Sequence, residues 1–106
     1  SSSAVFAAVS TASAEHCGIH GFYAHGSGSN IDVAGADASN LGDSGFVATY
    51  NAFVAAPSST GGTNGGYGYQ AADGGRIQRT SGTCTGSTGS VSPALNTDGN
   101  RGAMIT

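Results

Sequence analysis

The chain has 106 residues, of which only 8% are charged, and its net charge at neutral pH is −3. It contains three arginines and no lysine, so phosphate-driven binding of nucleic acid is not expected, and anionic membrane surfaces are disfavoured for the same reason. No apolar run approaches the length of a membrane span. We expect a single domain over residues 1–106, with no membrane span in this chain.

The core of this domain is expected to be thin. Leu, Ile, Val and Phe together number 16, while glycine alone contributes 19 residues. Such a chain buries little apolar surface, and ordering its glycines costs more conformational entropy than average. The core should therefore be completed either by a disulfide or by contact between copies.

Two cysteines, Cys17 and Cys84, predict that disulfide. A short chain with a pair of cysteines is typical of an oxidising compartment, and the sequence starts at Ser1 without a leader-like segment. A Cys17–Cys84 bridge would contribute about 4 kcal/mol in the chain-entropy model. We therefore expect a secreted or cell-surface domain, either a mature product or a trimmed ectodomain.

The N-terminal segment is predicted to be a short helix. Val5, Val9 and Ala12 recur at helical spacing in an alanine-rich stretch. The alternative is an N-terminal strand, because Val5 and Phe6 also suit a pleated surface. Short strands are expected next over residues 19–25 and around residues 31–33.

A second helix is predicted over about residues 44–56. Its apolar stripe recurs at helical spacing and consists of Phe46, Val47, Tyr50, Phe53 and Val54. Asp43 or Ser44 would cap its start and Pro57 would end it. This helix should bury Phe53 and expose Asn51.

A hairpin is predicted to follow, with strands over residues 67–72 and 76–80. Asp73-Gly74-Gly75 supplies the positive φ angles that a tight hairpin turn requires. Residues 102–106 would form a closing strand, and no internal repeat is apparent. The predicted fold class is therefore α+β: a small antiparallel sheet with one or two short helices and a single disulfide. A mainly β fold is the alternative.

The predicted hairpin carries a candidate binding surface. Tyr67 and Tyr69 would share one face, and Arg76 and Arg79 lie on the returning strand. Aromatic rings beside guanidinium groups could stack on a sugar or grip a carboxylate. The simpler interpretation is a half-exposed sheet face or a contact with a neighbouring subunit.

The densest group of ligand-type residues contains His16, Cys17, His20 and His25. Imidazole nitrogens suit Zn, Cu or Ni. On a strand, however, His20 and His25 point to opposite faces, and a disulfide-bonded Cys17 cannot bind a metal. We therefore expect no metal site and no cofactor.

The composition favours an extracellular structural or assembly subunit, such as a pilus-like, sheath or surface-layer component. Copies would associate through Val5, Phe6 and Val9, since low charge leaves little repulsion between them. One alternative is a secreted carbohydrate-binding or inhibitor module. The other, which would make the chain an enzyme and is less favoured, is a small secreted hydrolase. In it a histidine would act with one of three carboxylates, Asp32, Asp37 or Asp43.

Overall fold

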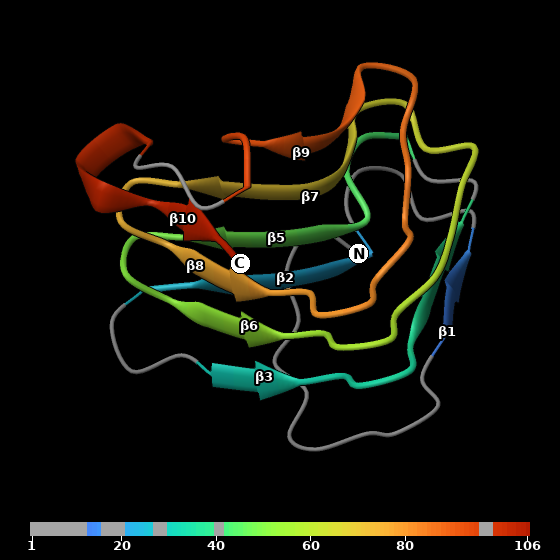
Figure 1. The fold of residues 1–106 in the computed structure, drawn as a ribbon, viewed down its shortest axis with the longest axis horizontal. Coiled ribbons are helices and arrows are strands. Elements are labelled where there is room, and N and C mark those ends of the chain that lie inside the picture. The colour runs from blue at the N-terminus through green and yellow to red at the C-terminus, as the bar shows by residue number, and fades with distance from the viewer. Residues whose placement is uncertain (1–12, 16–20, 27–29, 40–41, 96–98) are drawn as a thin grey trace.

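The fold is a stack of short parallel strands, seen side-on in Figure 1. The computed structural model describes residues 13–15, 21–26, 30–39, 42–95 and 99–106. One four-stranded sheet has the order β2 (Phe22–His25), β5 (Phe46–Thr49), β7 (Tyr67–Ala72) and β9 (Gly89–Ser92). The second has the order β3 (Asn30–Asp32), β6 (Phe53–Ala55), β8 (Arg76–Gln78) and β10 (Met104–Ile105).

The two four-stranded sheets and a third, shorter sheet form the three walls of a coiled chain path. The third sheet consists of β1 (Ser13–Glu15) and β4 (Asp37–Ser39), and a bridge from Asp37 to Thr60 continues it. The chain passes through all three walls before starting the next coil, which is the arrangement of a parallel β-solenoid. A three-residue 3-10 turn, η1 (Asn100–Gly102), precedes β10.

The predicted α+β fold with an antiparallel sheet is therefore wrong. Every strand pair in the described part of the chain is parallel, and its helical content is limited to η1. The mainly β alternative describes the structure better, although it did not anticipate the parallel pairing.

The register reveals an internal repeat that the sequence did not make apparent. Phe22 pairs with Phe46, Phe46 with Tyr69 and Tyr69 with Val91, so successive coils are offset by 22 to 24 residues. The last step of the second sheet is longer, because Arg76 pairs with Met104. The additional residues lie in the connection between β9 and β10, which contains η1.

The predicted helix over residues 44–56 is two strands, β5 and β6, joined by a tight corner. Tyr50 and Asn51 both have positive φ, and Ala52 N donates to Thr49 O across them. The two strands put Phe46 and Val54 into the core, while Phe53 is 37% exposed and faces outward. Phe53 and Val54 follow Phe46 by seven and eight positions, a spacing that also occurs on one face of a helix, which is why a helix was predicted here.

The predicted hairpin is also two strands of different sheets. β7 and β8 have nearly the expected bounds, and Asp73 and Gly74 form the expected turn with positive φ at both positions. However, β7 pairs with β5 and β9, whereas β8 pairs with β6 and β10. The corner repeats from coil to coil, since Asn51 N donates to Asp73 O.

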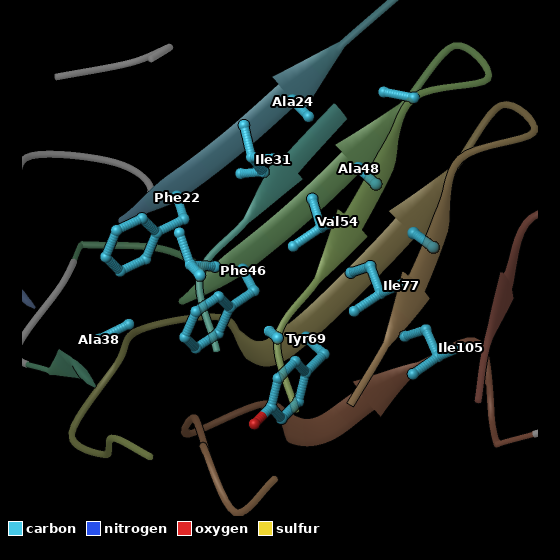
Figure 2. Packing of buried hydrophobic residues seen from close by; sticks show 14 of the residues in the cluster. Phe22, Ala24, Ile31, Ala38, Phe46, Ala48, Val54, Tyr69, Ile77 and Ile105 are labelled. Carbon is cyan, nitrogen blue, oxygen red and sulfur yellow. The ribbon is translucent and has the colours of Figure 1, made fainter. Parts of the chain in front are cut away.

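The core consists of side-chain rows that run along the coil axis (Figure 2). In-register parallel strands place equivalent residues about 4.8 Å apart, so equivalent side chains contact each other. Phe22, Phe46 and Tyr69 form an aromatic row with ring centroids 5.2 and 5.1 Å apart and nearly parallel planes. A facing aliphatic row comes from the second sheet and contains Ile31, Val54, Ile77 and Ile105.

Candidate functional site

The four residues of the predicted binding surface do not come together. Tyr69 is fully buried in the aromatic row, and Tyr67 is half-buried at the start of β7. Arg79 lies over the Tyr69 ring, with its guanidinium carbon 5.5 Å from the centroid. Arg76 is exposed on the outer face of the other sheet. The pairing of the hairpin strands was wrong, so the face it implied does not exist.

The buried hydroxyl of Tyr69 is held by hydrogen bonds. Ser59 Oγ donates to Ala56 O at 2.6 Å, so its single proton is used and Tyr69 Oη donates to Ser59 Oγ. Cys84 N donates to Tyr69 Oη at 3.2 Å. This network joins the aromatic row to the corner and to the last coil, which is a structural role.

The predicted single disulfide is not found among the described residues. Cys84 carries a free, buried thiol whose Sγ donates to Ala38 O, and Asn64 Nδ2 donates to this sulfur. Cys17 lies outside the described residues, as do His16 and His20. Rows of buried side chains that stack from coil to coil complete the core, which is the role that we had predicted for a disulfide.

Burial of Cys84 predicts a stability loss in alkali. Loss of solvation raises the pKa of the Cys84 thiol from 9.0 to about 12. The unfolded chain releases this proton near pH 9, whereas the folded chain keeps it until about pH 12. Burial of the neutral thiol thus stabilises the folded chain fully below about pH 9, and this stabilisation is lost as the pH rises toward 12.

Urea unfolding between about pH 7 and 11 measures this effect. Burial also raises the pKa of Tyr69, so its loss of stability has the same sign and begins at a higher pH. We expect Cys84→Ala to have a shallower alkaline decline than the natural chain, with the tyrosine part retained. Equal declines in the two proteins would contradict the burial of a neutral thiol at this position.

His25 belongs to a hydrogen-bonded cluster on the outer face of β2 and β5. Its Nδ1 lies 3.1 Å from Tyr23 Oη and 3.0 Å from Thr49 Oγ1, and these two oxygens are 3.1 Å apart. The Tyr50 ring packs on the imidazole with centroids 4.7 Å apart. The cluster therefore joins neighbouring coils, since Tyr23 and His25 come from one and Thr49 and Tyr50 from the next.

A groove lies on the outer face of the second sheet. Register places Phe53, Arg76 and Met104 side by side on β6, β8 and β10. Together with Ile77 and Thr106 they line a hollow of about 120 Å³, which we call the Phe53–Arg76–Met104 groove. Arg76 was predicted to belong to a binding surface, but not one with Phe53 or Met104, because their proximity depends on the parallel register.

A wider hollow of about 600 Å³ opens at a corner of the last coils. It is lined by Gly42, Thr63, Asn64, Gly65, Thr85, Gly86 and Ser87. Its largest side chain, Asn64, is buried and donates to Ala38 O and Thr85 O at 3.1 and 2.9 Å. The amide nitrogen thus connects successive coils.

Both sheets end on short, uncharged strands at the same end of the stack (Figure 1). β9 is Gly-Ser-Val-Ser and β10 is Met-Ile. Within the part of the chain that the structure describes, no strand pairs with the outer side of either one. We call these two strands the C-terminal edge. The absence of charge in these segments is visible in the sequence, but only the order of the strands shows that both lie at the edge of a sheet.

The predicted self-association residues Val5, Phe6 and Val9 lie outside the described residues. In the described ranges, no three His, Cys, Asp or Glu side chains gather as a metal site would require, and no helix there has the length and apolarity to cross a membrane. Comparison with protein-family models, curated proteins and solved structures finds no match.

Proposed function

We propose that the chain is a structural subunit whose copies associate head to tail through the C-terminal edge. The observation that carries this proposal is that both sheets finish, at one end of the molecule, on strands without a charged residue. An unpaired strand edge presents a row of N–H and C=O groups that another strand can satisfy, and natural proteins usually protect such edges with charges. Neither β9 nor β10 contains that protection.

The opposite end of the stack offers the complementary strand. β3 is the first strand of the second sheet and β10 is the last, so β10 of one copy could extend the ladder onto β3 of the next. Such a contact is heterologous, and repeated head-to-tail contacts give an open filament rather than a closed ring. The low charge of the chain, 8% of residues, reduces the repulsion between copies.

The contact would involve backbone groups more than large apolar side chains. Ala103 and Ile105, at the end of the second sheet, are already fully buried within one copy. Association should therefore be weak for each contact and should depend on concentration. The extracellular location remains a prediction from the sequence, since the disulfide that supported it is not found among the described residues.

Light scattering and electron microscopy across a concentration series test the proposal. We expect particle mass to grow with concentration, and Ser90→Lys, which puts a charge on exposed Ser90 of β9, to abolish this growth. Thr60→Lys is the matched control, because exposed Thr60 lies on an inner coil of the third wall. A natural chain that stays monomeric, or two variants that assemble equally well, would contradict the edge contact.

A further inference from the structure

Arg76 occupies the centre of the Phe53–Arg76–Met104 groove and has no partner for its charge within the described residues. Among the described residues, an ion pair forms between Arg101 and Asp73, with Nε and Oδ1 4.0 Å apart, and it does not involve Arg76. The Arg76 side chain is exposed and no described carboxylate lies within ion-pair distance of it. A guanidinium in this setting can offer two parallel N–H donors to one carboxylate.

The walls of the groove are apolar on both sides of this charge. Phe53 precedes Arg76 in the row and is 37% exposed, while half-buried Met104 follows it. Buried Ile77 contributes to the lining between them. A ligand that fits this groove therefore carries one carboxylate and an apolar face.

Polar groups extend the surface beyond the groove. Exposed Asn30 continues the row of Phe53 and Arg76 on β3, and exposed Gln78 lies in the neighbouring outward row on β8. Amide side chains offer both donors and acceptors and therefore suit hydroxyl groups. The same face thus provides an aromatic ring, a guanidinium and two amides.

We propose that this groove binds a uronic acid residue of an oligosaccharide. Arg76 receives the sugar carboxylate, Phe53 packs on the C–H face of the pyranose ring, and the amides of Asn30 and Gln78 contact hydroxyls of this or the adjoining sugar. This is a ligand function and does not depend on the association of copies through the C-terminal edge.

The geometry disfavours the other polymers that carry anionic groups. A peptide strand is recognised through backbone hydrogen bonds at a sheet edge, and the groove lies on a sheet face, where only side chains are offered. A nucleic acid needs several cations along its phosphates, and this face has Arg76 with Asp32 two strands away. A single carboxylate among neutral sugars matches the one guanidinium on the described part of this face.

Calorimetric titration with a glucuronyl-glucose disaccharide tests the inference. Its methyl ester and neutral cellobiose are the comparison ligands, because both keep the ring faces and remove the charge. We expect the acid to bind at least about tenfold more tightly than either, and Arg76→Gln to remove that preference. Phe53→Ala should weaken the binding of all three ligands.

Arg101→Gln is the matched control, since it also removes one exposed guanidinium but at the corner beside Asp73. It should leave the affinity for the acid unchanged, and circular dichroism should show that all variants keep the fold. Equal affinity for acid and ester, or an Arg76→Gln variant that binds like the natural chain, would overturn the inference. No binding of the disaccharide by the natural chain would overturn it as well.

Discussion

Phe46→Ala should destabilise the protein by about 3–5 kcal/mol. The Phe46 ring is fully buried and lies between two others, at 5.2 Å from the Phe22 centroid and 5.1 Å from the Tyr69 centroid. Removing it opens a cavity in the middle of the row and breaks two stacked contacts at once. Urea unfolding followed by circular dichroism measures the change in free energy.

Phe53→Ala is the control for this prediction, because it removes the same ring from the outer face. Because Phe53 is 37% exposed, this substitution should change the free energy of unfolding by no more than about 1 kcal/mol. If Phe46→Ala does not fold, Phe46→Leu keeps most of the volume and should still cost more than Phe53→Ala. Equal losses from Phe46→Leu and Phe53→Ala would contradict the inward orientation of Phe46.

Gly68→Ala should be at least as damaging, with an expected loss of about 3 kcal/mol or more. A Cβ at Gly68 would collide with the carbonyl group of Cys84 in the next coil, and that group is backbone, so it cannot rotate away. The substitution must push two coils apart. Thermal unfolding of the variant measures the cost, and size-exclusion chromatography shows whether a compact state remains.

Gly62→Ala tests whether close approach, rather than loss of glycine, causes that effect. At Gly62 an added Cβ meets only the Thr85 hydroxyl, at an ordinary contact distance of 3.4 Å. Its stability should change by less than about 0.5 kcal/mol. Similar losses at both glycines would show that the coils are not packed as closely as the structure has them.

Local signals in the sequence located several elements but not their partners. The turn at Asp73 and Gly74 was predicted because these residues favour positive φ, and both adopt it. The bounds of β7 and β8 were nearly right for the same local reason. Pairing them as a hairpin was wrong, because a tight corner fixes a change of direction and says nothing about the strand that will lie alongside.

A repeat signal was present at the level of three residues. Three segments occupy equivalent positions in successive coils of the first sheet: Phe-Tyr-Ala at residues 22–24, Phe-Val-Ala at 46–48 and Tyr-Gln-Ala at 69–71. Their middle residues differ from coil to coil and lie outside the core cluster, so the similarity is confined to an aromatic residue and an alanine. Two positions in about 23 are too few to stand out in a chain this rich in alanine.

The sequence by itself determined the low charge, the small amount of apolar volume and the turn at Asp73 and Gly74. These properties depend on composition and on the conformational preferences of single residues. Only the tertiary structure decided that strands pair in parallel about 23 residues apart, that Phe46 faces inward while Phe53 faces outward, and that Arg76 lies between Phe53 and Met104. Each of these outcomes depends on register between coils, which forms when equivalent side chains stack and which no local preference encodes.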